Sequence, residues 1–121
     1  METNCTKPLH SKEACAKSLN AVGDALYAIG GKWKLRVIIA LRSGNKRFNE
    51  LQRTIPGISA RVLSHELKEL EMNGFLKRNV FTKTPVVVEY ELTGYSDTLD
   101  NVLNALSEWG IMHREKIKNE R

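Results

Sequence analysis

The sequence predicts a mainly α-helical protein with one small β-hairpin, in the order helix, helix, helix, helix, strand, strand, helix. Three observations support this order. Apolar residues recur at helical spacing up to about residue 73, the pattern becomes strand-like between residues 75 and 92, and helical spacing returns from residue 95. The 121 residues are 41% hydrophobic and 27% charged, the composition of an ordinary globular domain.

The N-terminal part divides into an arm and two helices. Residues 1–15 are polar and without a pattern, so we expect a flexible arm before a single folded domain at 16–121. A helix is predicted at about 17–29, ended by Gly30-Gly31. The stretch Lys32–Ser43 is apolar around nearly its whole circumference, which indicates a buried central helix. The apolar face of the first helix is formed by Leu19, Val22, Leu26 and Ile29.

The middle of the chain predicts two helices joined by a tight turn. Asn49 and Gln52 have the spacing of a capping box for a short helix. Pro56-Gly57 ends that helix, and Ser59 is a good N-cap for the next one, which Asn73-Gly74 ends. The inward stripe of this second helix consists of Leu63, Leu67 and Leu70. The arrangement is a helix-turn-helix.

A hairpin and a long helix complete the domain. The runs Phe75–Phe81 and Val86–Leu92 favour strands joined by a tip at 82–85, with a small extra strand near Lys46-Arg47. A helix-turn-helix followed by a hairpin is a winged helix-turn-helix. The last helix is expected to fray from Arg114 onward. Its apolar positions are Tyr95, Leu99, Val102, Leu103, Leu106, Trp109 and Met112.

The first and last helices carry more apolar surface than a small winged domain can cover. We therefore expect the helices at about 17–29 and 94–117 to pair across a two-fold axis as a homodimer. Two copies of the second helix of the helix-turn-helix would then meet successive major grooves on a palindromic site. In the alternative arrangement, the last helix folds back onto its own domain.

The charge distribution points to an anionic partner. The net charge is +5, and the segment from Lys46 to Lys83 has eight Lys or Arg against four Glu. Arg61 suits bidentate contact with guanine, Ser64 and His65 could reach base edges or phosphate, and Lys68 suits phosphate. The predicted partner is double-stranded DNA. The alternative for this surface is a solvated helix face.

Flanking residues extend the candidate DNA-binding set. Arg78 and Lys83 on the hairpin could contact the DNA backbone or minor groove, or they could merely discourage edge-to-edge aggregation. Lys32 and Lys34 could bind a phosphate at the start of a helix, or they could form the solvent-exposed end of an otherwise buried helix. The full predicted set is Lys32, Lys34, Ser59, Arg61, Ser64, His65, Lys68, Arg78 and Lys83.

Other functional classes find little support. No phosphate-binding loop or nucleophile–base set is present, so we expect neither an enzyme nor a cofactor. His10, His65 and His113 are scattered and the two cysteines match no zinc pattern, which argues against a metal site. The longest apolar run, Val37–Leu41, is far too short for a membrane span, and no apolar signal region begins the chain. We therefore expect a cytoplasmic protein, in which a structural disulfide is not favoured.

Several short motifs of this chain form a combination that is specific as a set. The segments are Ile29–Trp33, Arg47–Leu51, Ile55–Ser59, Leu63–Leu70, Glu89–Thr93 and Trp109-Gly110. Together they resemble the HxlR family of bacterial winged helix-turn-helix regulators, in unbroken order from about residue 15 to residue 112. The resemblance implies a homodimer built from the terminal helices, which binds operator DNA through the second helix and the wing and represses or activates nearby genes.

The resemblance also raises the question of an effector. Some members sense electrophiles or oxidants through a cysteine ahead of the Gly-Gly-Lys-Trp segment, which makes Cys15 the candidate redox-sensing residue. Cys15 lies about eighteen residues before Trp33, and Ala16 follows it where the sensing members have proline. A redox sensor and an inert thiol both remain open. So does a small-molecule pocket between the core and the terminal helices.

A rival function from another class is a winged-helix module for protein–protein assembly, with incidental basic charge. If the protein binds DNA through several phosphates, its affinity should weaken steeply as salt rises. A protein–protein module should show no affinity for DNA at any salt concentration. Salt dependence therefore separates the two hypotheses.

Overall fold

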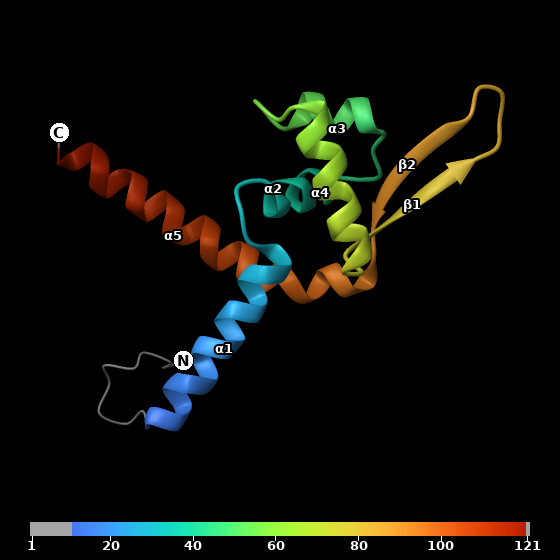
Figure 1. Ribbon diagram of the computed structural model, residues 1–121. Helices are drawn as coiled ribbons and strands as arrows, with labels where there is room; N and C mark the ends of the chain where they lie inside the picture. Colours follow the sequence, from blue (N-terminus) through green and yellow to red (C-terminus); the bar gives the residue numbers. More distant parts are fainter. Residues whose placement is uncertain (1–10, 121) are drawn as a thin grey trace.

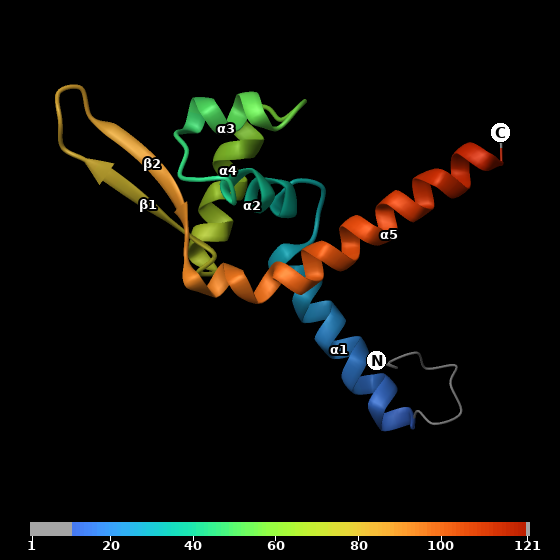
Figure 2. The same ribbon diagram turned by 180° about the vertical axis from the view of Figure 1, so that it is seen from behind.

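The computed structural model describes residues 11–120 of the chain. The predicted order of elements is confirmed, with a short 3₁₀ helix added before the last helix. A central group of α2, α3 and α4 carries the hairpin on one side, and α1 and α5 project away from it (Figures 1 and 2). The elements are α1 (Lys12–Ile29), α2 (Lys34–Leu41), α3 (Phe48–Thr54), α4 (Ala60–Met72), β1 (Leu76–Phe81), β2 (Val87–Leu92), η1 (Gly94–Leu99) and α5 (Asp100–Asn119).

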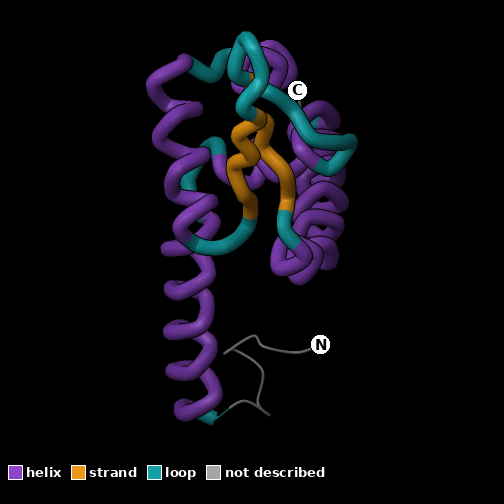
Figure 3. Tube along the Cα trace, turned by 90° about the vertical axis from the view of Figure 1, so that its right-hand side faces the viewer, coloured by secondary structure: helices purple, strands orange, loops and turns teal. Residues whose placement is uncertain are grey.

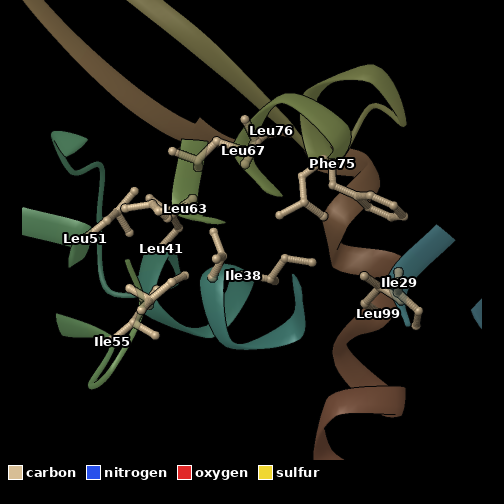
Figure 4. Close-up of a cluster of buried hydrophobic side chains, with 14 of the residues drawn as sticks. Ile29, Ile38, Leu41, Leu51, Ile55, Leu63, Leu67, Phe75, Leu76 and Leu99 are labelled. Atoms are coloured by element: carbon tan, nitrogen blue, oxygen red, sulfur yellow. The ribbon is translucent and has the colours of Figure 1, made fainter. Parts of the chain in front are cut away.

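The hydrophobic core lies where α2, α3, α4 and the base of the hairpin meet. Ile38 of α2 points toward the side of α4 that carries Leu63 and Leu67 (Figure 4). At one end of the cluster Ile29 of α1 lies beside Leu99 of η1, which ties both projecting helices to the same core (Figure 4). The predicted inward stripe of α4, Leu63, Leu67 and Leu70, is fully buried.

The helix ends follow from local capping, with two differences from prediction. The hydroxyl of Ser11 accepts a hydrogen bond from the Ala14 N–H at 3.0 Å, so α1 begins at Lys12 and residues 12–15 belong to a helix instead of an arm. Residues 1–10 of the predicted arm lie outside the described residues. The cap of α3 is also different: the Arg47 N–H donates to Glu50 Oε1 at 2.8 Å, and the predicted Asn49–Gln52 pair is not the cap.

The turn before α4 was predicted correctly. Gly57 adopts φ +83°, a left-handed conformation that glycine accepts without strain. The Ser59 hydroxyl then accepts from the Val62 N–H at 3.1 Å, which confirms it as the N-cap. These two local features set where α4 starts.

The hairpin is antiparallel, with Leu76 opposite Leu92 at its base and Phe81 opposite Val87 near its tip. The expected extra strand near Lys46 is a single bridge to Tyr90. Seen from the side of the wing, the hairpin lies between helical segments on either side (Figure 3). Its base is therefore anchored while its tip projects.

The last helix was predicted to fray from Arg114 onward, but it does not. α5 continues to Asn119, and the ion pair between Lys116 and Glu120 at 2.7 Å spans its last turn. Leu103 is the residue of α5 that is buried in the core. The rest of its apolar stripe remains exposed, including Leu106, Trp109 and Met112.

Candidate nucleic-acid interface

The outer side of α4 carries the predicted reading residues. Arg61, His65 and Lys68 are exposed and Ser64 is half-buried, on the side of the helix opposite the leucine stripe. We refer to Arg61, Ser64, His65 and Lys68 as the reading face. Within residues 11–120, Arg61 and Lys68 make no ion pair, so their charges are available to an external anion.

The wing forms one wall of a groove beside the reading face. A hollow of about 400 Å³ lies between α4 and the hairpin. Arg78 of β1 stands opposite Tyr90 of β2, and both line this hollow together with Ser64 and Lys68. The structure thus brings together residues from the helix and from the wing that sequence reasoning could only name separately. Tyr90 was not predicted, since nothing in its sequence context separates it from a core aromatic residue.

The tip of the wing is exposed and basic. The Lys83 ammonium lies 5.7 Å from the centre of the Phe81 ring, a cation–π contact that leaves the charge at the surface. Further down the hairpin, Asn79 donates to Glu91 at 2.9 Å. That hydrogen bond lowers the pKa of the Glu91 carboxyl below its ordinary value, and the positive charge of Lys77 adds to the effect.

The opposite flank of α4 differs from the prediction. Lys34, a candidate phosphate ligand, is only 8% exposed. Its ammonium lies 2.6 Å from Glu66 Oε1 and 2.8 Å from Glu69 Oε1, both on α4. The charge of Lys34 is therefore used within the domain, and we leave this residue out of the proposed DNA contacts. The sequence could not show this pairing, because Lys34 and Glu66 are 32 residues apart.

The ionisation of this group follows from its contacts. Burial disfavours the charged form of Lys34, but hydrogen bonds and attraction from Glu66 and Glu69 outweigh it, so the pKa of Lys34 rises above 10.5. The hydrogen bond from Lys34, followed by its positive charge, lowers the pKa of Glu69 below 4.5. Lys34 and Glu69 are therefore held in their charged forms.

The same group contains a potential set of metal ligands. Among residues 11–120, His65, Glu66 and Glu69 each offer one ligand atom within 4.8 Å of the others. However, the Lys34 ammonium already contacts both carboxylates. Because a bound ammonium supplies the positive charge that a metal would bring, we assign no metal to this group.

The loop before α2 and the first turn of α2 each supply a further basic side chain. Lys32 is exposed, with its ammonium 4.8 Å from the centre of the Trp33 ring. Arg36, which sequence reasoning did not single out, contacts the same ring at 5.4 Å. The ring itself is half-buried and packs near the turn at Gly57. Lys32 and Arg36 are thus held close to the turn that precedes α4.

Cys15 lies on α1, where it is half-buried and disulfide-bonded. The other cysteine, Cys5, lies outside the described residues. The disulfide differs from the sequence expectation. That expectation rested on the redox poise of a cytosol, which is a property of the compartment and not of the chain.

Comparison with known proteins decides the family. A family model described as HxlR-like helix-turn-helix matches residues 28–118, which is most of the chain. The chain belongs to the HxlR-like helix-turn-helix family. The match includes the turn, α4 and the whole wing, so the reading face lies within the HxlR-like region.

Individual HxlR-like relatives agree with this assignment. The chain is 39% identical over 97 residues to the HTH-type transcriptional regulator YtcD of Bacillus subtilis (strain 168), covering 80% of this chain and 77% of YtcD. A crystal structure of an HTH-type transcriptional regulator named ytcD matches with a TM-score of 0.75 and 40% identity, over 78% of this chain and 96% of that one. HypR, described as a redox regulator, has been solved in oxidised and reduced forms. The reduced form matches with a TM-score of 0.75 and 38% identity, over 82% of this chain and 98% of HypR.

These comparisons confirm the predicted family and the winged helix-turn-helix fold. HxlR-like relatives are helix-turn-helix transcriptional regulators and not enzymes, and the family implies DNA binding. Across residues 11–120, none of the helices combines the length and the apolar character that a membrane span requires.

Proposed function

We propose that this protein is a sequence-specific transcriptional regulator that binds palindromic operator DNA as a homodimer. Arg61 reads guanine in the major groove, Ser64 and His65 contact base edges or phosphate, and Lys68 contacts phosphate. The N-terminal turn that Ser59 caps directs backbone N–H groups toward the duplex. Arg78 and Lys83 of the wing, together with Lys32, contact the DNA backbone on either side of α4.

The observation that carries the proposal is the shared hollow beside α4. Ser64 and Lys68 of α4 and Arg78 of β1 line the same groove, although they come from separate elements. Lys68 and Arg78 are exposed and, within residues 11–120, neither has an acidic partner. Glu71 also lines this hollow and Lys77 of the wing pairs with Glu91, so among residues 11–120 the wing cations without an acidic partner are Arg78 and Lys83. A helix with these two cations on the wing beside it matches the shape and charge of a phosphate backbone flanking a major groove.

The homodimer is supported by the uncovered apolar faces of the two projecting helices. Leu106, Trp109 and Met112 of α5 lie at helical spacing, and each is at least half exposed. α1 exposes a second apolar face with Leu19, Val22 and Leu26. Contiguous apolar surface of this kind marks an interface in a protein that stays in solution. A second copy supplies matching faces across a two-fold axis.

Selection from a random duplex library by the purified protein tests the proposal. We expect an inverted repeat to be enriched, with half-site centres about 10–10.5 base pairs apart or a multiple of that spacing. Affinity for the selected duplex should fall steeply with rising salt, because phosphate contacts release counterions. Enrichment of no sequence would contradict the proposal. It would favour a protein–protein module instead.

A second candidate function is a redox response through Cys15. It is favoured by the disulfide at Cys15 and by the similarity to HypR, a redox regulator solved in two oxidation states. The proposed effector is an oxidant or electrophile that acts on the Cys15 thiol of the reduced protein; an oxidant takes up two electrons and the thiol protons as the disulfide forms. After reduction with dithiothreitol and removal of the reductant, diamide should release the wild-type protein from DNA and leave a Cys15→Ser variant bound. Equal release of both proteins would rule out this role of Cys15.

A further inference from the structure

We propose that Lys34 is a positioning residue that sets the rotation of α4 about its own axis through its contacts with Glu66 and Glu69. We call these three residues the Lys34 cluster. The inference rests on the proposed function, because the rotation of α4 decides where the reading face meets base edges. It assigns Lys34 a role in discriminating between sequences without any contact to DNA.

The contacts of the Lys34 cluster are short and sheltered. Lys34 is the first residue of α2, and its ammonium lies 2.6 Å from Glu66 Oε1 and 2.8 Å from Glu69 Oε1. The side chain of Glu66 is only 12% exposed, whereas that of Glu69 is 42% exposed. A single cation therefore holds two carboxylates that are three residues apart and lie on neighbouring positions of one helix flank.

This flank faces away from the groove of the wing. Ser64 and Lys68 line the hollow beside the hairpin, whereas Glu66 and Glu69 contact α2. His65 bridges the two sides, with its Nε2 atom 3.5 Å from Glu69 Oε2. The reading face therefore lies between the wing on one side and the Lys34 cluster on the other.

Directional contacts are needed to fix a rotation. The leucine stripe packs α4 against the core, but apolar contact is non-directional and tolerates small turns of the helix. Hydrogen bonds to a single ammonium at two points weaken steeply when their geometry changes. A turn of about 10° moves an atom at the helix surface by about 1 Å, given a helix radius of roughly 5–6 Å. Binding constellations tolerate only about 0.5 Å.

Stability alone is a weak reason for a lysine at this place. Taking an ammonium and two carboxylates out of water is costly, and apolar residues of similar volume are often as stabilising as a buried ion pair. Apolar residues in place of all three members of the Lys34 cluster would fill the same space without that cost, whereas loss of Lys34 alone leaves the sheltered Glu66 carboxylate without its partner. The geometry of the cluster, and not its contribution to the free energy of unfolding, is therefore what distinguishes it.

The test compares Lys34→Met with a matched core variant of the same helix. Val37→Ala also lies on α2 and removes fully buried methyl groups, but it leaves the Lys34 cluster intact. The readout is the ratio of affinities for the selected duplex and a scrambled duplex, at one salt concentration and at a temperature where circular dichroism shows both variants folded. We expect Lys34→Met to lower the ratio about tenfold and Val37→Ala to leave it within about twofold.

Each other outcome has a defined meaning. An unchanged ratio for Lys34→Met, or an equal loss for Val37→Ala, would overturn the positioning role while the proposed function stands. A wild-type protein that selects no sequence would overturn the proposed function and this inference with it. If Lys34→Met does not fold, Glu69→Gln replaces it, because the exposed carboxylate of Glu69 can be changed without burying a new group. We then expect about a threefold loss, and no loss would overturn the inference.

Discussion

The central group of helices buries its apolar side chains, whereas the projecting helices leave most of theirs exposed. α4 buries every leucine of its stripe within its own chain, and Leu67 is 2% exposed. α5 has a stripe of similar character but buries only Leu103, and Trp109 is 58% exposed. The central group is complete within one chain, whereas the projecting helices leave apolar faces exposed. We therefore propose that the first region reads DNA and that the second pairs two copies of the chain.

The largest expected effect concerns the complete region. Leu67→Ala should lower the free energy of unfolding by about 2–5 kcal/mol, because it leaves a cavity in the core. Urea denaturation followed by circular dichroism measures this loss. Leu106→Ala is the matched control on α5, where the side chain is half exposed, and it should cost much less at protein concentrations below the dimer dissociation constant. Equal losses at the two sites would remove the distinction.

The next effect concerns pairing. Trp109→Asp places a charge in the proposed interface and should weaken the homodimer at least a hundredfold, about 2.7 kcal/mol. Sedimentation equilibrium should then give the mass of one chain, 13.7 kDa, at concentrations where the wild-type protein gives twice that value. A wild-type protein that already sediments as a single chain would leave the projecting helices without their assigned role.

A smaller effect separates the reading face from the wing. Arg61→Ala should cost about 1–3 kcal/mol of discrimination between bases at one position of the selected site. Lys83→Ala, the matched loss of one positive charge, should weaken binding to all duplexes about equally. Anisotropy titrations on the selected duplex and its single-base variants measure both. Should Arg61→Ala behave like Lys83→Ala, Arg61 contacts phosphate instead of a base.

The smallest effect is a pH dependence of stability. Folding lowers the pKa of Glu69, so its stabilising contribution is complete well above 4.5 and is lost as pH falls from 4.5 through the folded-state pKa. Folding raises the pKa of Lys34, so the contribution of Lys34 is complete below 10.5 and is lost as pH rises through its folded-state pKa. Lys34→Met should therefore flatten the acid limb of a plot of melting temperature against pH. Parallel acid limbs for variant and wild type would show that Glu69 gains nothing from Lys34.

The sequence predicted features that depend on neighbouring residues. Gly57 and Ser59 determine the turn and the start of α4 through conformations and hydrogen bonds within a few residues. The cap of α3 was predicted wrongly because the pairs Asn49–Gln52 and Arg47–Glu50 have the same spacing. Only the structure shows that Arg47 and Glu50 form the cap. α5 continues past Arg114, where fraying was predicted, and an ion pair between Lys116 and Glu120 lies in its last turn.

Features that depend on distant residues could not be predicted from spacing. Lys34 looked like Lys32, an exposed basic residue at a helix start, until the fold brought Glu66 and Glu69 beside it. Tyr90 enters the groove because strand register places it opposite Arg78. The reading face, by contrast, could be predicted, because the periodicity of a helix places Arg61 and Lys68 on the side opposite the leucine stripe. Their roles at DNA remain predictions.

Methylation interference on the selected duplex tests the central claim most directly. Guanine N7 lies in the major groove, where α4 is proposed to bind. We expect methylated N7 to block binding at two clusters of guanines about one helical turn apart, one for each copy of α4. Arg61→Ala should abolish the interference at one guanine of each cluster. Binding that is indifferent to N7 methylation throughout the site would contradict it.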